Sequence, residues 1–345
     1  MFILKKWRKF TEDEKSIFFF AAAFCIVIFG CKKDICEPQT IYSLGTICVV
    51  NLYEDGTYEN YSEIINLLKD IDNKFSVNKE DSEISKVNQS AGSGNAVNVS
   101  KEVYEVVEQS LEFARLTQNS FNPAMGTLIK MWGIGTDHQR IPGKEEIAEA
   151  LEHCNPRVII LTEVPGFDES ENLYLIEITD SKTQLDLGAI VKGYATDKIV
   201  EILKAKNVRK AIVNLGGNIY VYGQKSKFNP DENWNVGIKN PVNPDGGVIE
   251  TVSLKSGSVV TSGNYERYFE ENGKRYHHIL DYKTGYPAES GLASVSVIYD
   301  KSIVCDALAT ACYVSGVNGD FNPYEIGFDG IKIVFIDFNG KPVIK

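Results

Sequence analysis

Residues 185–198, LDLGAIVKGYATDK, combine groups that could bind an anion and a cation. Apolar and polar residues alternate over 183–187, which predicts a strand, and helical spacing follows from Lys192. Such a turn presents backbone N–H groups and the Lys192 ammonium to an anion. Carbonyls at the end of the strand, such as that of Ala189, face outward and could bind a hard cation. Alone, the pattern is more typical of a tight strand-to-helix turn with a solvated lysine.

A second set of oxygen ligands lies in KSIVCDALATACYVSG at residues 301–316. Asp306 and Thr310 are four residues apart, so a helix places their side-chain oxygens on one face, one turn apart. A carboxylate, a hydroxyl and an external carbonyl form an oxygen-only set suited to Mg²⁺, which keeps waters and shares the phosphates of a ligand. By itself the spacing is more typical of a helix in which Asp306 lies near the cap and Thr310 bonds back to a carbonyl.

The third stretch, GKRYHHILDYKTGYP at residues 273–287, contains a histidine pair. In a strand over 274–281, His277 and His278 point to opposite faces, so only one of them can serve a given site as a base. A single strand histidine is more often structural than catalytic, and this stretch is therefore a weak signal when it is taken alone.

The elements that must position these groups are neighbouring strands and separate helices, without regular β-α alternation. Helices are predicted over 61–75, 100–117, 144–154, 192–206 and 302–314. Strands are predicted over or near 46–54, 157–162, 172–179, 183–187, 210–217, 218–223, 234–240, 247–254, 258–263, 274–281, 293–299 and 331–337. This order predicts an α+β fold with mainly antiparallel sheets and flanking helices, in a single domain over 41–345.

Charge and cysteine content restrict the classes of function. The 345-residue chain has a formal net charge of −11, which argues against a nucleic-acid partner because such proteins carry a basic surface. Of its seven cysteines, Cys305 and Cys312 are separated along a helix by about 10.5 Å, too far for a disulfide. No disulfide framework is implied.

The N-terminus has the pattern of an export signal. Basic residues precede SIFFFAAAFCIVIFG at residues 16–30, an apolar run that is short for a membrane-spanning helix. The Gly30–Cys31 junction resembles a bacterial lipobox, which would make 1–30 a signal peptide, Cys31 the lipidated (palmitate-bearing) residue, and 31–40 a polar tether. The alternative is an uncleaved N-terminal anchor. Both interpretations place the rest of the chain outside the cytoplasm, tethered to a membrane on its periplasmic side.

Taken together and in this order, DLGAIVKGYATD, YHHILDYKTGYP and CDALATACYVSG resemble the ApbE family, the FAD:protein FMN transferases. Four further stretches are similar to segments of that family and extend the resemblance over nearly all of 41–345. They are SLGT at 43–46, FSVNKEDSEISKVN at 75–88, FNPAMGTLIKMWGIG at 121–135 and AIVNLGGNIYVYG at 211–223. The resemblance implies a single ApbE-like, T-fold-like domain.

Residue roles follow from the resemblance, position by position. It implies that Mg²⁺ is bound by the Ala189 carbonyl, Asp306 and Thr310, and that His278 acts at the reacting phosphate. It also implies that the flavin nucleotide is contacted by Leu44, Asn78, Asp186, Lys192, His278 and Ile279. The sequence departs from the family at Leu44, where a methionine is usual, at Asn122, where an aspartate is usual, and at Asn78, where many members carry an aromatic residue. The last change could leave the pocket open to water.

The resemblance implies that FMN is transferred from FAD to a threonine or serine hydroxyl of an exported protein, such as a redox-pump subunit, with release of AMP. Two alternatives remain. Water could replace the acceptor, which would make the protein a Mg²⁺-dependent FAD pyrophosphatase that yields FMN and AMP. The protein could also be a lipoprotein that binds FAD without catalysis.

Overall fold

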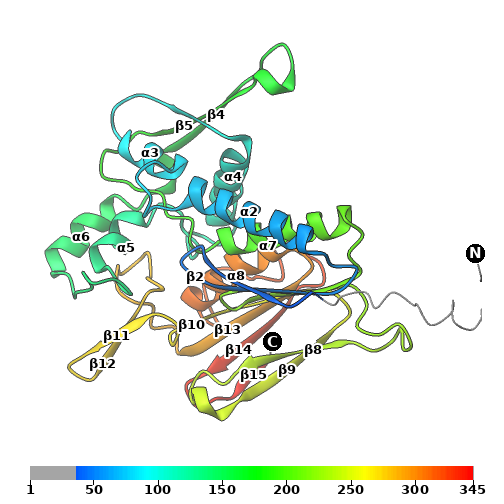
Figure 1. Cartoon of the computed structure of the whole chain (residues 1–345). Coiled ribbons are helices and arrows are strands. Elements are labelled where there is room, and N and C mark those ends of the chain that lie inside the picture. The colour runs from blue at the N-terminus through cyan, green and yellow to red at the C-terminus, as the bar shows by residue number, and fades with distance from the viewer. Residues whose placement is uncertain (1–35, 345) are drawn as a thin grey trace, which may run out of the picture. The chain divides into compact units, whose positions relative to one another are not determined.

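A computed structural model of the chain describes residues 36–344, and its largest sheet has eight strands (Figure 1). The strand order is β1-β2-β6-β7-β10-β13-β14-β15, and all neighbouring strands are antiparallel. The strands are β1 (Gln39–Ser43), β2 (Thr46–Glu54), β6 (Lys210–Leu215), β7 (Asn218–Tyr222), β10 (Gly257–Gly263), β13 (Leu292–Tyr299), β14 (Lys332–Asp337) and β15 (Pro342–Ile344).

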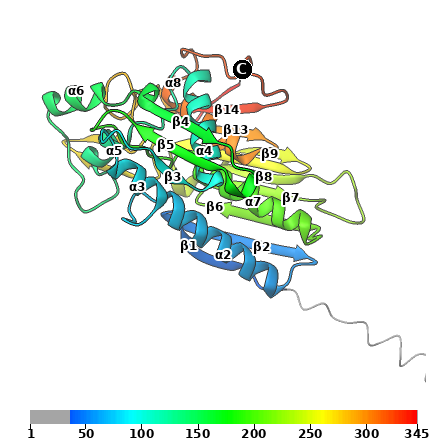
Figure 2. The ribbon, with the colours of Figure 1, turned by 90° about the horizontal axis from the view of Figure 1, so that it is seen from above.

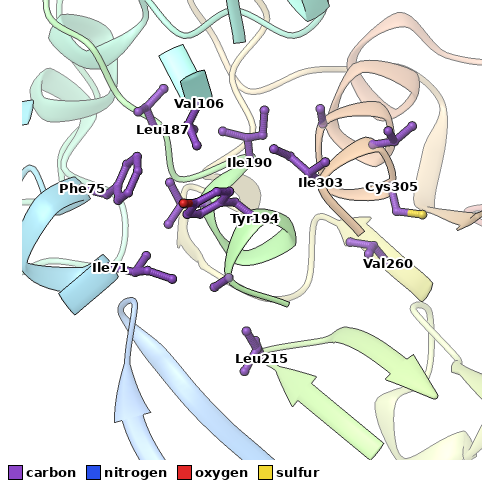
Figure 3. Close-up of a cluster of buried hydrophobic side chains, with 14 of the residues drawn as sticks. Ile71, Phe75, Val106, Leu187, Ile190, Tyr194, Leu215, Val260, Ile303 and Cys305 are labelled. Carbon is purple, nitrogen blue, oxygen red and sulfur yellow. The ribbon is translucent and has the colours of Figure 1, made fainter. Parts of the chain in front are cut away.

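Two helices, α7 (Val191–Ala205) and α8 (Ser302–Ser315), cover one face of this sheet, and α2 (Tyr58–Phe75) packs against α7 (Figure 1). The core lies between the helices and the sheet. Figure 3 shows Tyr194 of α7 and Ile303 of α8 in this layer, and both side chains are buried. Burial of such apolar side chains contributes the main driving force for folding and fixes the two helices side by side.

The hairpin of β8 (Trp234–Lys239) and β9 (Val248–Leu254) covers part of the opposite face. Trp234 and Val236 form a small apolar cluster with side chains of β7, β10 and β13 that point away from α7 and α8. Because successive residues of a strand face opposite sides, the central strands are buried on both faces.

The remaining elements form a second group around a three-stranded sheet of order β3-β5-β4 and a separate β11-β12 hairpin. Viewed from above, β4 and β5 lie over α4, and α2 runs along β1 (Figure 2). The elements are α3 (Glu83–Gln89), β3 (Val97–Val99), α4 (Lys101–Leu116), α5 (Gly126–Trp132), α6 (Lys144–Glu152), β4 (Ile159–Val164), β5 (Leu173–Ile178), β11 (Tyr268–Glu271) and β12 (Lys274–His277). Three short 3-10 turns span Pro156–Val158, Glu169–Glu171 and Pro244–Gly246.

The predicted α+β class with antiparallel sheets is confirmed, and all five predicted helices are present within a few residues of their expected bounds. Two helices, α3 and α5, were not predicted. Each has seven residues, too few turns for a periodic apolar face to stand out in the sequence. The strands β1, β3, β11 and β15 were not predicted either, because each is too short to show a clear alternation of apolar and polar residues.

Two predicted strands need correction. Residues 183–187 are extended but belong to no strand, because their backbone bonds to a side chain and a loop instead of a neighbouring strand. The Asn88 amide donates to the Leu185 carbonyl and accepts from its N–H, and the Asp186 N–H donates to the Pro123 carbonyl. The strand expected over 274–281 ends at His277, beyond which only one isolated bridge, Leu280 to Pro287, continues the pairing.

The described residues begin at Cys36, whose side chain is buried, and β1 starts at Gln39, slightly before the expected boundary at residue 41. The predicted signal over 1–30 and the lipidation of Cys31 lie outside the described residues. The five cysteines of the described part are all buried free thiols. None of the helices within 36–344 is long and apolar enough to cross a membrane.

Candidate active site

A cleft of about 330 Å³ opens where the turn before α7, the face of α8 and the β11–β12 hairpin approach one another. Nine predicted site residues line it, although they come from segments far apart in the sequence. They are Leu44, Asn78, Asp186, Ala189, Lys192, His278, Ile279, Asp306 and Thr310. Cys31, the predicted lipidation site, lies outside the described residues.

The first turn of α7 is bound directly to α8 by a buried carboxylate. Lys192 Nζ lies 3.2 Å from Asp306 Oδ1, and the Gly193 N–H donates to Asp306 Oδ2 at 2.9 Å. Lys192 also donates to the carbonyl of Gly188 at 2.9 Å. Asp306 is only 3% exposed, so these donors offset the cost of burying its charge.

Close approach of the two helices depends on Gly193. A side chain at this position would lie 2.5 Å from the Ser302 carbonyl oxygen, at the start of α8. The Asp197 carboxylate of α7 also accepts from the N–H groups of Ser302 and Ile303, at 2.9 and 3.0 Å. This contact satisfies two of the otherwise unpaired donors at the N-terminus of α8 and fixes the position of Asp306 one turn later.

Three oxygens of the predicted cation site face the same cleft: the Asp306 carboxylate, the Thr310 hydroxyl and the Ala189 carbonyl. Within residues 36–344 no hydrogen bond reaches the Ala189 carbonyl, because the Gly193 N–H that would reach it in a regular helix donates to Asp306 instead. The Thr310 hydroxyl lies 3.3 Å from Ser262 Oγ. The described residues contain no group of three or more His, Cys, Asp or Glu that could hold a metal, so a cation here would rely on neutral oxygens and one carboxylate.

His278 lies at the cleft with its Nδ1 atom 3.2 Å from the Arg267 carbonyl. A carbonyl only accepts hydrogen bonds, so Nδ1 carries the proton and Nε2 keeps a free lone pair. Burial, followed by the charge of Arg267, lowers the pKa of His278 to about 3. The ring is therefore neutral near pH 7 and able to accept a proton through Nε2.

His277 points away from the cleft, as strand alternation predicts. Its ring is 5% exposed, makes an edge contact with Tyr313 at 5.5 Å between centroids, and bonds through Nε2 to the Ala288 carbonyl at 3.2 Å. Burial lowers its pKa to about 4. These contacts assign His277 a structural role.

Asp186 and Leu44 are fixed by backbone contacts. Asp186 Oδ1 accepts from the Gly188 N–H at 2.8 Å, and burial raises the pKa of this carboxyl against the opposing effect of that bond and of two nearby cations. Leu44 has a φ of 53° in the β1–β2 turn, and its N–H donates to Asp72 at 3.2 Å. A left-handed leucine is strained, and the Asp72 contact compensates for part of that strain.

Asn78 and Asn122, the other two positions at which the sequence departs from the family pattern, have different surroundings. Asn78 is exposed in the turn after α2, where Ser76 Oγ accepts from its backbone N–H at 3.3 Å. Its side chain makes no hydrogen bond within 36–344, so it does not cap the turn. Asn122 donates through Nδ2 to the Cys154 carbonyl at 2.8 Å, a bond that an aspartate could not make.

Two residues of the cleft were missed by sequence reasoning. Arg267, whose carbonyl accepts from the His278 N–H, and Asn218 at the start of β7 both line it. The side-chain Oδ1 of Asn218 accepts from the Ser302 hydroxyl at 2.7 Å, while its Nδ2 atom is buried without a partner in the described part of the chain. A single arginine before a short hairpin and a single asparagine after a glycine pair carry no periodic or spacing signal.

Comparisons with known proteins agree with this geometry. The model of the ApbE family matches residues 44–323. The chain is 38% identical over 282 residues to an FAD:protein FMN transferase of Treponema pallidum, covering 79% of this chain and 77% of that protein. It is 34% identical over 256 residues to an FAD:protein FMN transferase of Klebsiella pneumoniae, covering 74% and 75%.

Solved structures show the same fold. The ApbE protein of Thermotoga maritima has a TM-score of 0.75 at 32% identity, covering 90% of this chain and 96% of that one. The apo form of the Pseudomonas stutzeri flavinyl transferase ApbE has a TM-score of 0.73 at 27% identity, covering 89% and 93%.

Proposed function

The chain belongs to the ApbE family and is an FAD:protein FMN transferase, and we propose that it acts with Mg²⁺ on a threonine or serine hydroxyl of an exported acceptor protein. The observation that carries this proposal is the cleft in which a neutral histidine, a lysine and a buried carboxylate converge. His278, Lys192 and Asp306 come from three separate segments, and all three line that cleft.

The donor set fits Mg²⁺. Asp306 supplies one carboxylate oxygen, Thr310 a hydroxyl, and Ala189 a carbonyl that has no other partner within 36–344. Hard oxygen donors with few protein charges suit a cation that keeps waters and shares the phosphates of its substrate. When bound, Mg²⁺ would supply charge neutralisation at the FAD diphosphate.

The reaction then depends on what His278 and Lys192 do. His278 Nε2 accepts the proton of the acceptor hydroxyl, and the oxygen forms a bond to the FMN-side phosphorus. The bond between that phosphorus and the bridging oxygen breaks, so AMP leaves with the bridging oxygen and the acceptor keeps FMN through a phosphoester. Lys192, fixed by Asp306 and Gly188, holds positive charge beside the diphosphate without needing to reorganise.

A FAD pyrophosphatase is the second candidate, favoured by one observation. Asn78 is exposed at the cleft and offers a small polar side chain where an aromatic ring would exclude water. Water would then take the place of the acceptor hydroxyl, with the same groups in the same roles. A protein that only binds FAD is the third candidate, and the free Nε2 of His278 beside Lys192 argues against it.

The acceptors in this proposal are flavin-carrying subunits of exported redox pumps, and the enzyme acts on the periplasmic side of a bacterial membrane. An anchor at Cys31 would hold the domain at the membrane surface, within reach of membrane-bound acceptors. The basic and apolar pattern of residues 1–30 supports this location.

One experiment separates the three candidates. The full-length protein in detergent is incubated with FAD and Mg²⁺, with and without a purified acceptor subunit, while AMP, free FMN and protein-bound flavin are measured. A transferase releases AMP and flavinylates the acceptor only in the samples that contain the acceptor. A pyrophosphatase releases AMP and free FMN in either case. If AMP forms under neither condition, the proposed activity is wrong.

A further inference from the structure

Arg267 lies directly beside the histidine that serves the reaction. Tyr268 of β11 pairs with His277 of β12, and the His278 N–H donates to the Arg267 carbonyl at 3.1 Å. Arg267 and His278 are therefore the next pair along the same antiparallel ladder. Residues directly opposite in such a ladder present their side chains on the same face, and both of these residues line the cleft.

The guanidinium of Arg267 has no partner in the described part of the chain. It makes no hydrogen bond or ion pair within 36–344, whereas Lys192 is already engaged by Asp306 and Gly188. The aliphatic part of Arg267 lies against Gly135, where an added Cβ would be 3.4 Å from its Cδ atom. This contact supports the stem of the side chain while leaving its charged end free.

The charge balance of the cleft favours a further cation at the diphosphate. Four acidic side chains line it, Asp72, Asp186, Glu266 and Asp306, against two basic ones, Lys192 and Arg267. A diphosphate brings further negative charge into this acidic surrounding. The charge of Arg267 also acts on both Asp186 and His278, since it lowers the pKa of each. The free guanidinium is thus within electrostatic reach of the position where the reacting phosphate must meet His278.

We propose that Arg267 is a catalytic residue that binds the non-bridging oxygens of the FMN-side phosphate while the acceptor oxygen attacks. This inference rests on the proposed transferase function. A planar guanidinium offers two parallel donors to a phosphate and keeps its charge throughout the reaction, unlike a histidine. It neutralises charge on the oxygens around the phosphorus, while His278 handles the proton of the incoming hydroxyl and AMP leaves on the other side.

The test compares Arg267→Gln, Arg267→Lys and the matched control Arg275→Gln. Arg275 lies on β12 of the same hairpin but on the opposite face, where it pairs with Glu270. FMN transfer and AMP release are measured at saturating FAD and Mg²⁺. Removing one preorganised donor to a developing charge lowers kcat by about 100-fold or more, so we expect that loss for Arg267→Gln. Arg267→Lys should keep part of the activity, and Arg275→Gln should stay within about twofold of wild type, as expected for a surface ion pair.

A loss of folding must be separated from a loss of chemistry. Arg267→Ala is therefore assayed with and without guanidinium ion at concentrations well below those that unfold the protein. Recovery of AMP release with added guanidinium supports the proposal. Loss of activity without recovery, together with a lowered unfolding midpoint, assigns Arg267 a structural role and overturns it.

The wild-type protein in the same assay distinguishes failure of the proposed function from failure of the proposed role of Arg267. If wild type releases no AMP, the proposed transferase function is wrong. If wild type and Arg267→Gln release AMP and flavinylate the acceptor at equal rates, the function stands and the role of Arg267 is wrong.

Discussion

Lys192 Nζ and Asp306 Oδ1 lie 3.2 Å apart and join two helices, although the two residues are 114 positions apart in the sequence. The pair is reinforced by the Gly193 N–H, which donates to the other carboxylate oxygen of Asp306 at 2.9 Å. One carboxylate thus fixes the first turn of α7, orients the lysine and still faces the cleft. The same carboxylate therefore holds the two helices together and presents its charge to the cleft.

Asp306→Asn keeps the shape of the side chain and one of its hydrogen-bond acceptors, so turnover and stability can be compared in one variant. The amide keeps an oxygen acceptor for the Gly193 N–H but loses the charge that a cation needs. We expect FMN transfer to fall by about 100-fold or more at limiting Mg²⁺, because charge stabilisation at the diphosphate is lost. The free energy of unfolding should also fall, by about 1.5–3 kcal/mol, because a neutral amide cannot replace the ion pair with Lys192.

The measurement is AMP release across a Mg²⁺ titration, with urea unfolding of the same samples. Asp320→Asn is the control, because Asp320 pairs with Lys283 on an exposed surface and does not line the cleft. Equal turnover by wild type and Asp306→Asn at limiting Mg²⁺ would contradict the proposed binding of a cation by Asp306.

Gly193→Ala should move α7 away from α8. The added methyl group would lie 2.5 Å from the Ser302 carbonyl oxygen, and overpacking of this kind costs about 1–3 kcal/mol. We expect lower stability and reduced FMN transfer, because Lys192 and Asp306 no longer meet. Gly143→Ala at the start of α6 is the control, since its new methyl group approaches only the flexible end of Glu146. Wild-type activity and stability in Gly193→Ala would show that the helix contact tolerates a side chain.

Substitution of His278 should reduce activity, whereas substitution of the adjacent His277 should reduce stability. His278→Ala removes the proposed base that faces the cleft and should abolish FMN transfer while FAD binding persists. His277→Gln removes a buried ring between Tyr313 and the Ala288 carbonyl, so it should lower stability but keep the activity of the folded fraction. FAD binding by flavin fluorescence and AMP release distinguish the two, and an essential His277 would contradict the assigned faces.

The same pair gives a pH dependence with a defined sign. Burial lowers the pKa of His277 to about 4 in the folded state, whereas the unfolded chain binds the proton at about 6.5. The stability that depends on neutral His277 is therefore complete above about pH 6.5 and is lost as the pH falls towards 4, by up to about 1.4 kcal/mol per pH unit. The free energy of unfolding, measured by urea at several pH values, should fall less steeply in His277→Gln than in wild type.

Asn78→Tyr tests whether the cleft admits water. A tyrosine ring in the turn after α2 could stack on the bound nucleotide, adding about 0.5–1.5 kcal/mol beyond its buried area and excluding water. We expect wild type to release AMP slowly from FAD without an acceptor, and Asn78→Tyr to suppress this release and retain FAD more tightly. Equal acceptor-free AMP release by the two proteins at saturating FAD and Mg²⁺ would remove the case for hydrolysis at this position.

Cys31→Ala tests the proposed anchor. Without a thiol at the lipobox position, no lipid can be attached, so the protein should keep its signal or leave the membrane fraction. Membrane fractionation and determination of the mature N-terminus measure this outcome. A mature N-terminus at any residue other than Cys31 would contradict the lipoprotein proposal, although not export itself.

Local patterns in the sequence were enough to predict several features of the site. Asp306 and Thr310 share a helix face because the α-helical repeat brings residues four apart together, and both line the cleft. His277 and His278 face opposite ways because a strand alternates, and the structure places only His278 in the cleft. These predictions use spacing over a few residues, which the backbone fixes before any tertiary contact forms.

The features that depend on contacts between residues far apart in the sequence were determined by the tertiary structure. Residues 183–187 have the alternation of a strand, but the side chain of Asn88 takes the place of a neighbouring strand. Arg267 reaches His278 only because a two-stranded hairpin pairs their backbones, and Gly193 is needed only because α8 passes so close. The spacing of apolar residues in a sequence indicates whether a segment is a helix or a strand and which of its faces is buried. Which distant group meets that face is set by packing, and packing determined how Asp306, Thr310, Ala189, His278 and Arg267 come to line one cleft.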